Sequence, residues 1–207
     1  ILGIIPKGSG NGLARTLNIP LTVDDAIAVI NKDRIQAIDV AYANEYAFVS
    51  NAGVGFDALV IEKFRDNKRR GFASYCKVIA KTIFFYKDRE WTITVDGKRF
   101  NERAFFINVA NGKQLGYDFV IAPHADHTDG LLDVTIIKKF PKLLGGWLAL
   151  QMRNRTIHKN KFVISLQAKE VVVEAPHLKR MQTDGDPHPI TSPLRFKIEG
   201  TQRVFIP

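Results

Sequence analysis

The chain has 207 residues, of which 45% are hydrophobic and 25% are charged, a balance typical of a globular protein with one substantial core. Its single cysteine, Cys76, excludes an internal disulfide and a zinc site built from several cysteines, and the apolar residues around it predict a buried thiol. The longest weakly polar stretch, residues 143–152, is too short for the roughly 20 residues of a membrane span. We therefore expect a soluble, cytoplasmic protein.

The formal net charge is +9. Basic residues gather in three clusters: Lys68-Arg69-Arg70, Lys138-Lys139, and the group Arg153, Arg155, His158, Lys159 and Lys161. Two interpretations are equally open, a solvated basic face and a surface that docks on an anionic membrane. Nucleic acid would be attracted by the same charge, but no helix-turn-helix, zinc-finger or aromatic RNA-binding pattern accompanies it, so we expect no nucleic-acid partner.

The first five residues, Ile1 to Ile5, form an apolar run that predicts a buried strand of a parallel sheet. Residues 6–12 then predict a glycine-rich loop, and a helical pattern begins at Leu13. A buried strand needs neighbouring strands, and no other strand precedes this one in the chain. We therefore expect the chain to begin inside a domain.

Periodicity and turn signals predict the remaining elements. The expected helices are 24–30, capped near Thr22, then 55–65, 71–86 and 141–152. The expected strands are 35–42, 46–53, 91–95, 104–110, 132–137, 162–166, 171–175, 179–183, 194–199 and 204–206. The strand over 91–95 ends in Asp96-Gly97, a hairpin signal. So many short strands predict an α+β fold with a β-sandwich-like domain.

The glycine loop has a chemical use. Gly8 and Gly10 let the backbone approach a ligand closely, Ser9 offers a hydroxyl, and the N–H groups of the following helix favour a phosphate. Arg15, one turn into the helix, adds charge. Two interpretations remain, a phosphate site and a plain turn in which Ser9 or Asn11 caps the helix. The segment lacks the Lys-Ser/Thr pair of a P-loop and the third glycine of a dinucleotide fingerprint.

Asp184-Gly185-Asp186 is the best candidate for chemistry. Phosphoryl transfer to a hydroxyl needs a carboxylate within hydrogen-bond reach of that hydroxyl, and two aspartates flanking a glycine could provide a base and a positioning group. The alternative is a hairpin turn, for which Asp96-Gly97 is a comparison within the same chain. Considered without any family resemblance, these three residues favour the hairpin turn.

Four segments occur in the order and spacing of one family: the glycine loop, residues 51–58, residues 123–133 and residues 182–187. The chain resembles the catalytic region of the diacylglycerol kinase and sphingosine kinase superfamily, most closely its soluble bacterial lipid kinases. The resemblance implies the end of an ATP-binding α/β domain at 1–34, a β-rich domain at 35–200, and a last strand at 201–207 that returns to the first domain. The family's Gly-Gly-Asp-Gly-Thr nucleotide loop would precede Ile1, so we expect these 207 residues alone to be inactive.

The resemblance also implies residue roles. It places Gly8, Ser9, Gly10, Asn11 and Arg15 next to ATP. It makes Asp186 the general base with Asp184 beside it, although the family usually has glutamate at the former position. Gly12 is a second departure, because bacterial relatives commonly carry aspartate there.

The segment Pro123 to Asp133 offers oxygen ligands, and the resemblance implies a structural Mg²⁺ held by the Asp129 side chain and the carbonyls of Asp126 and Leu131. His124 and His127 suggest zinc, but no cysteine or acidic partner stands at zinc spacing. For the Asp129-Gly130 pair, a turn before a strand is the alternative. Residues 51–57 are expected to line the active-site cleft that the family has between its two domains, with Phe56 against an acyl chain. A role in packing alone is an equally open interpretation of this segment.

Together these features predict an ATP-dependent lipid kinase that uses Mg²⁺ and phosphorylates a hydroxyl of a diacylglycerol-like or sphingoid lipid. The expected partners are the lipid and an anionic membrane surface, and exposed strand edges make a homodimer plausible. The alternatives are an NAD kinase, which shares the two-domain plan, and a non-catalytic lipid-binding protein on the same fold.

Overall fold

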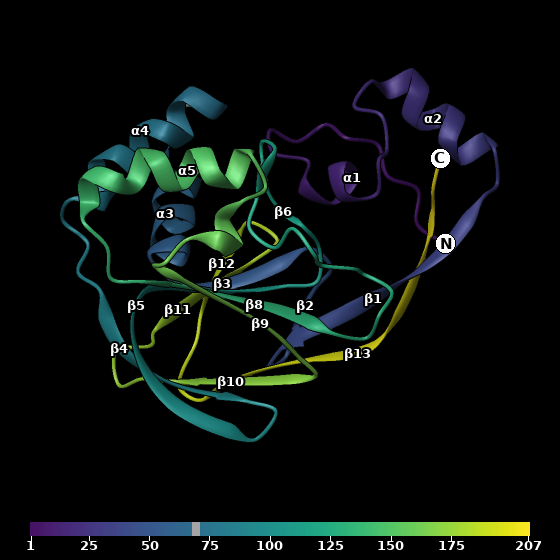
Figure 1. Ribbon diagram of the computed structural model, residues 1–207. Helices are drawn as coiled ribbons and strands as arrows, with labels where there is room; N and C mark the ends of the chain where they lie inside the picture. Colours follow the sequence, from purple (N-terminus) through teal and green to yellow (C-terminus); the bar gives the residue numbers. More distant parts are fainter. Residues whose placement is uncertain (68–70) are drawn as a thin grey trace.

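A computed structural model describes residues 1–67 and 71–207. The architecture is a curled antiparallel sheet with helices along one side (Figure 1). The helices are α1 (Gly12–Thr16), α2 (Val23–Asn31), α3 (Phe56–Arg65), α4 (Phe72–Ile83) and α5 (Gly145–Arg153), with 3₁₀ turns η1 (Lys142–Leu144) and η2 (Ile157–Lys159). The predicted α+β class is confirmed. None of the described helices is both long and apolar enough to cross a bilayer.

The main sheet follows the order β12-β11-β3-β5-β4-β10-β13-β1-β2, and β8 joins β5 to β9. Its strands are β1 (Ile35–Ala43), β2 (Tyr46–Phe48), β3 (Asn51–Gly55), β4 (Arg89–Val95), β5 (Lys98–Ala110), β8 (Leu132–Lys138), β9 (Val163–Ala168), β10 (Glu170–Glu174), β11 (Arg180–Thr183), β12 (Asp186–Pro189) and β13 (Leu194–Phe205). A separate small ribbon consists of β6 (Gln114–Gly116) and β7 (Phe119–Val120). Because β5 pairs with β4 along its first half and with β3 and β8 along its second, it joins the two halves of the curl.

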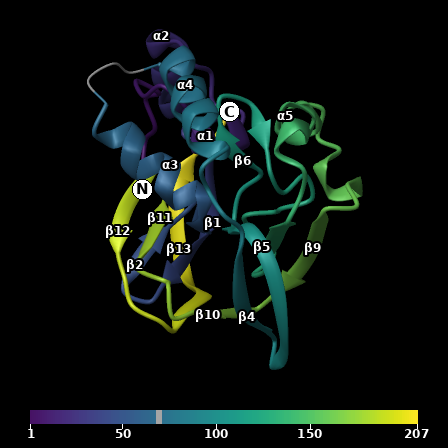
Figure 2. The same cartoon turned by 90° about the vertical axis from the view of Figure 1, so that its left-hand side faces the viewer.

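Three apolar clusters hold the fold together. The largest fills the inside of the curled sheet, where alternate residues of the strands point inward. The second is aromatic, centred on Phe56, Phe105 and Phe140, and α3, α4 and α5 cover it. The third joins α1 and α2 to the ends of β1 and β13 through Leu17, Ile38 and Val204. Figure 2 shows the helices gathered at one end of the sheet and the β4–β5 hairpin at the other.

The helix near Thr22 is confirmed, because the Thr22 hydroxyl accepts a hydrogen bond from the Asp25 amide and caps α2. The Asp96-Gly97 hairpin is also confirmed, with both residues at positive φ. The expected strand over 46–53 is two strands, β2 and β3, interrupted at Val49 and Ser50. The strands expected at 194–199 and 204–206 are one continuous strand, β13.

Several predictions are wrong. Residues 1–5 are not a buried strand: a single bridge joins Leu2 to Val204, and Ile1 is 60% exposed because no further strand among the described residues covers it. Cys76 is exposed, because the helical period of α4 turns Tyr75 and Ile79 inward and Cys76 outward. The helix expected over 141–152 begins with a 3₁₀ turn. The sequence did not predict β6, β7 or β12. The basic cluster at 68–70 lies outside the described residues.

Candidate functional site

The turn Asp184-Gly185 joins β11 to β12, and both residues have positive φ, 49° and 91°. This is the geometry of the Asp96-Gly97 hairpin, where φ is 45° and 81°. In both hairpins the aspartate carboxylate accepts backbone hydrogen bonds: Asp96 from the amides of Lys169 and Glu170, and Asp184 from a neighbouring strand connection. The hairpin interpretation is therefore correct for the local fold, and it assigns the first aspartate an anchoring role.

The anchor at Asp184 is threefold. Its Oδ2 accepts from the Val49 amide at 2.8 Å, and its Oδ1 accepts from the amides of Ser50 at 2.8 Å and Asn51 at 2.9 Å. The residue as a whole is exposed, but its carboxylate is turned inward. Loss of hydration there raises the pKa of the carboxylate, and the three hydrogen bonds, which lower the pKa, offset this only in part. These oxygens are occupied by backbone donors, so this carboxylate positions the turn.

The surroundings of the Asp186 carboxylate differ from those of Asp184. It is exposed, and within the described ranges its carboxylate has no hydrogen bond or ion pair. Its strand, β12, is the edge of the sheet, so one side of the residue faces outward. Of the two aspartates, Asp186 is the one whose carboxylate is free to meet a ligand.

Beneath the turn lies a buried polar network that the sequence did not reveal. Gln182 accepts from the Gly185 amide at 2.9 Å, and its Nε2 donates to Asn51 Oδ1 at 2.8 Å and to Asp57 Oδ2 at 2.9 Å. Asn108 Nδ2 donates to the same Asn51 oxygen at 3.2 Å. Burial raises the pKa of Asp57 to about 6, although the hydrogen bonds from Gln182 and Asn108 act in the opposite direction and lower it.

The glycine loop packs against β6. The Gly10 carbonyl accepts from the Tyr117 amide at 3.2 Å and from Arg15 Nε at 3.3 Å, so Arg15 folds back over the loop. Gly8 and Ser9 are exposed. Asn11 occupies the N-cap position of α1 in a left-handed conformation, as one interpretation expected, but its side chain makes no capping hydrogen bond. Because α1 has only five residues, its dipole adds little to anion binding.

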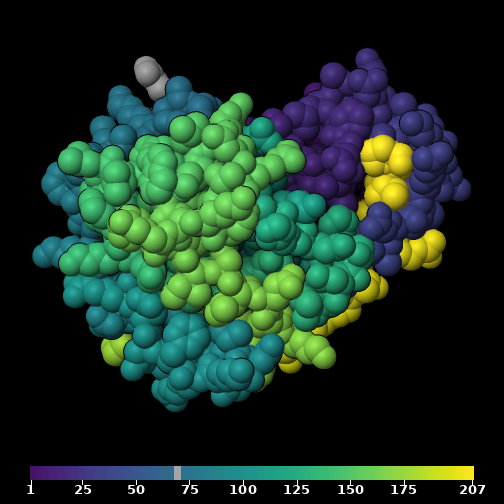
Figure 3. Space-filling model, in the orientation of Figure 1, coloured from purple at the N-terminus to yellow at the C-terminus, as the bar shows by residue number. Residues whose placement is uncertain are grey.

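Ser50 and Asn51 connect the loop to the turn. A Cβ on Gly12 would lie 3.5 Å from Ser50 Oγ, and Ser50 Oγ donates to the Gln114 carbonyl at 3.3 Å. Asn51 Nδ2 donates to that carbonyl at 3.1 Å, while the amides of both residues bind Asp184. The first, second and fourth motifs therefore meet at one point. Figure 3 shows a notch between the purple N-terminal segment and the green helical region.

The loop predicted to hold a metal lies around Asp39 of β1. The Asp39 amide donates to the His127 carbonyl at 2.7 Å, and Asp39 Oδ2 accepts from the Gly130 amide at 2.9 Å. Asp129 Oδ1 accepts from the Leu131 amide, and the Asp126 carboxylate accepts from Thr128, which lowers the pKa of Asp126.

Within the described ranges no group of three or more acidic, histidine or cysteine side chains could hold a metal ion. A cation there would therefore depend on backbone carbonyls and water besides one or two carboxylates. Such an oxygen set suits Mg²⁺, and Asp39, which the sequence analysis missed, adds a second carboxylate at the loop.

Asn111 links this loop to the turn. Its Nδ2 donates to the Asp39 carbonyl at 2.8 Å and to the Val49 carbonyl at 3.0 Å. Phe56 is only 7% exposed and stacks on Phe105, with ring centroids 4.4 Å apart. It is therefore part of the aromatic cluster and does not face open space.

The curled sheet and its anchored acidic hairpin define an α+β protein of the NAD kinase and diacylglycerol kinase fold. Residues 50–202 match the family described as the YegS C-terminal NAD kinase beta sandwich-like domain, and residues 1–43 match the diacylglycerol kinase catalytic domain. The chain belongs to this family, and the resemblance drawn from its motifs is confirmed.

Among its relatives is a protein of Shewanella frigidimarina (strain NCIMB 400) named "Probable lipid kinase YegS-like". It is 27% identical over 205 residues, which are 95% of this chain and 64% of the relative. A protein of the same name from Yersinia enterocolitica serotype O:8 / biotype 1B is 29% identical and shares 96% of this chain and 66% of its own. The chain thus spans a little under two thirds of these relatives. A crystal structure of a diacylglycerol kinase from Bacillus anthracis str. Sterne superposes over 99% of this chain and 66% of its own, with 21% identity and a TM-score of 0.71, and supports the fold.

Proposed function

We propose that the whole protein is an ATP-dependent lipid kinase that transfers a phosphoryl group to a hydroxyl of a diacylglycerol-like or sphingoid lipid. One observation carries this proposal: the exposed carboxylate of Asp186, which has no partner within the described ranges, follows a turn that Asp184 fastens to Ser50 and Asn51. Ser50 lies beside Gly12 of the glycine loop, and both Ser50 and Asn51 donate to the Gln114 carbonyl next to it. A free carboxylate held rigidly near a phosphate-binding loop is what phosphoryl transfer to an alcohol requires.

In this reaction Asp186 accepts or orients the proton of the attacking hydroxyl. Gly8, Ser9, Gly10 and Asn11 approach the nucleotide with backbone and side-chain donors, and Arg15 holds the loop through the Gly10 carbonyl. Bound Mg²⁺ would neutralise phosphate charge or stiffen the loop of Asp126, Asp129 and Leu131.

The shorter side chain of Asp186 is the feature that favours a non-catalytic lipid-binding protein instead. Aspartate reaches one methylene less far than the glutamate usual in the family. A kinase therefore needs either a closer approach of the substrate to β12 or a bridging water.

The test is transfer of labelled γ-phosphate by the whole protein. The acceptors are diacylglycerol, monoacylglycerol, a sphingoid base, phosphatidylglycerol and NAD. Asp186→Asn should abolish product because it removes the base, while Asp186→Glu should change the rate. Asp184→Asn is the matched control: it should lower stability by about 1 to 3 kcal/mol by weakening a charged acceptor of three amides, a loss that Asp186→Asn does not share.

Labelled lipid that disappears with Asp186→Asn supports the proposal and identifies the acceptor. Labelled NAD would replace it with the NAD kinase alternative. Lipid binding without any labelled product, in the parent and in Asp186→Glu alike, would establish the non-catalytic protein.

A further inference from the structure

One segment of the chain has an exceptional charge distribution. Residues 134–169 contain eight of the 30 basic residues and none of the 21 acidic ones. The rest of the chain is nearly balanced, with 22 basic and 21 acidic residues, so this segment carries almost the whole net charge. The eight residues are Lys138, Lys139, Lys142, Arg153, Arg155, Lys159, Lys161 and Lys169. None of them forms an ion pair with any residue that the structure describes.

The same segment exposes an apolar stripe. Leu143, Trp147 and Leu150 are 86%, 44% and 54% exposed, and their spacing of four and three residues places them on one side of η1 and α5. The inner side of α5 is also apolar, because Leu148 is buried in the aromatic cluster and Met152 packs against it. The helix therefore has more apolar surface than its own fold uses.

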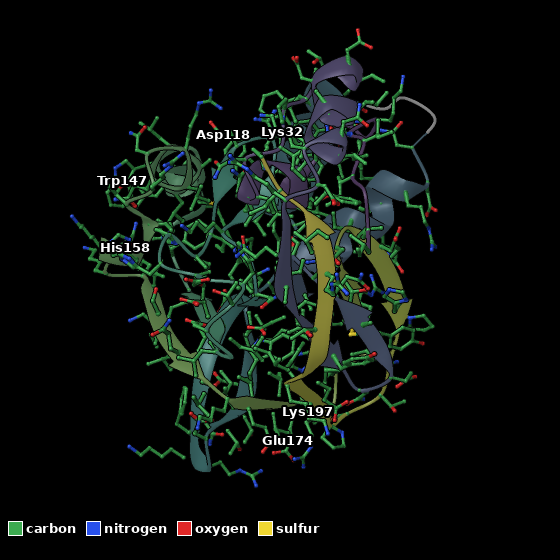
Figure 4. The ribbon with its side chains drawn as sticks, turned by 90° about the vertical axis from the view of Figure 1, so that its right-hand side faces the viewer. Lys32, Asp118, Trp147, His158, Glu174 and Lys197 are labelled. Atoms are coloured by element: carbon green, nitrogen blue, oxygen red, sulfur yellow. The ribbon has the colours of Figure 1, made fainter. Side chains whose placement is uncertain are left out.

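The apolar stripe and the basic segment that follows it in the chain lie on one side of the molecule. Figure 3 shows the green α5 region and the yellow-green segment that follows it on the front of the molecule. In Figure 4, Trp147 and His158 both lie at one outer edge, away from Lys32 and Lys197. The apolar surface extends toward α4, since a Cβ on Gly145 would lie 2.7 Å from Ile83, and the next residues, Phe84 and Phe85, are 61% and 87% exposed.

We propose that the α5 face, formed by Leu143, Trp147 and Leu150 with Arg153, Arg155, Lys159 and Lys161, docks this protein on an anionic lipid membrane. Unpaired cations attract anionic headgroups by about 1 kcal/mol each, and a tryptophan with two leucines enters the region between headgroups and acyl chains. The apolar stripe favours a membrane over nucleic acid, whose phosphates would engage the cations and leave the stripe exposed. The docking surface extends the proposed lipid kinase function, but vesicle binding does not require turnover.

The first experiment measures cosedimentation of the chain with vesicles. We expect binding to vesicles of equal parts phosphatidylcholine and phosphatidylglycerol, weakening with salt, and little binding to phosphatidylcholine alone. Arg153→Gln/Arg155→Gln/Lys159→Gln should weaken binding at least about tenfold. The matched control removes three exposed lysines elsewhere, Lys32→Gln/Lys98→Gln/Lys179→Gln, and should weaken it far less. Equal effects of the two triple variants would overturn the proposal, since net charge alone would then explain binding.

Tryptophan emission locates the docking face directly. The chain has two tryptophans, and Trp91 is only 2% exposed, so a change on vesicle binding reports Trp147. We expect a blue shift and quenching by brominated lipid, both lost in Trp147→Phe while binding remains. Trp147→Ser/Leu150→Ser should weaken binding, whereas Leu21→Ser, at a leucine 40% exposed before α2, should not.

Vesicle binding with unchanged Trp147 emission would overturn the proposal, because another face would then be in contact. Absence of vesicle binding, with binding to lipid-free DNA that the basic variant weakens, would overturn it in favour of nucleic acid. The docking proposal and the kinase proposal can fail independently. Vesicle binding through Trp147 without phosphoryl transfer would overturn the kinase proposal and support the docking surface. Phosphoryl transfer to dispersed lipid without vesicle binding would overturn the docking surface and support the kinase.

Discussion

Asp184 and Asp186 are two residues apart, yet their carboxylates have different surroundings. Three amides of another strand connection surround the first, and the second is exposed at a sheet edge. A third carboxylate, Asp57, is buried below the turn and bonded to Gln182. Position relative to the sheet, and not residue type, therefore assigns an anchoring role to one aspartate, a proposed chemical role to another, and a place in a buried network to the third.

Asp57 should make stability depend on pH. Burial raises its pKa from 3.8 to about 6, so the folded state holds its proton more tightly than the unfolded state. The stabilisation of the fold by the neutral Asp57 carboxyl is complete below about pH 4. It is lost as the pH rises through 6, and the free energy of unfolding falls by about 3 kcal/mol in all. Asp57→Asn cannot ionise and should gain stability relative to the parent over that interval.

Urea unfolding of both proteins between pH 4 and 8 measures this difference. Other groups titrate in both proteins and cancel in the comparison. A difference that does not change with pH would show that Asp57 is not a buried, titrating carboxyl in the folded protein.

At the scale of elements, the start of α3 depends on the absence of a side chain in β3. A Cβ on Gly53 would lie 2.1 Å from Asp57 Oδ2, and that oxygen is fixed by Gln182. The strand and the helix can pack this closely only with glycine at that position. This explains one glycine of the second motif by packing against a carboxylate.

Gly53→Ala should therefore lower the free energy of unfolding by about 1 to 3 kcal/mol, through the clash with Asp57. Gly146→Ala is the matched control. No atom of the described residues lies within 4 Å of its added Cβ, and alanine in α5 should raise stability by about 0.5 to 1 kcal/mol. Thermal and urea unfolding of the two variants should move in opposite directions, and a neutral Gly53→Ala would contradict the close packing of β3 and α3.

For the whole molecule, the question is whether residues 1–34 fold with the sheet. Leu17 and Ala26 from this segment share one apolar cluster with Ile38 of β1 and Val204 of β13. Leu2 also bridges to Val204, which places the first and last residues side by side (Figure 1). The proposed division into domains at 34 and 200 remains a prediction, and this shared cluster allows it to be tested.

Leu17→Ala should cost about 2 to 4 kcal/mol, because the side chain is 5% exposed and its loss leaves a cavity in that cluster. Leu21→Ala makes the same chemical change at a side chain 40% exposed and should cost much less. If the segment folds with the sheet, calorimetry should show one transition that shifts as a whole. A separate early transition in Leu17→Ala would mean that residues 1–34 unfold independently.

The sequence by itself determined the fold class, most elements and the family, because periodicity, capping at Thr22 and the Asp96-Gly97 hairpin are local signals, and four motifs in order are specific. Its failures are non-local. The exposure of Ile1 and Cys76 depends on which neighbours cover them, and β12 has too few apolar residues to be recognised without its partner β11. The anchoring of Asp184 by the amides of residues 49–51 and the network of Asp57 with Gln182 were decided by the tertiary structure alone. Each joins segments whose proximity depends on strand pairing and packing, which no local pattern encodes.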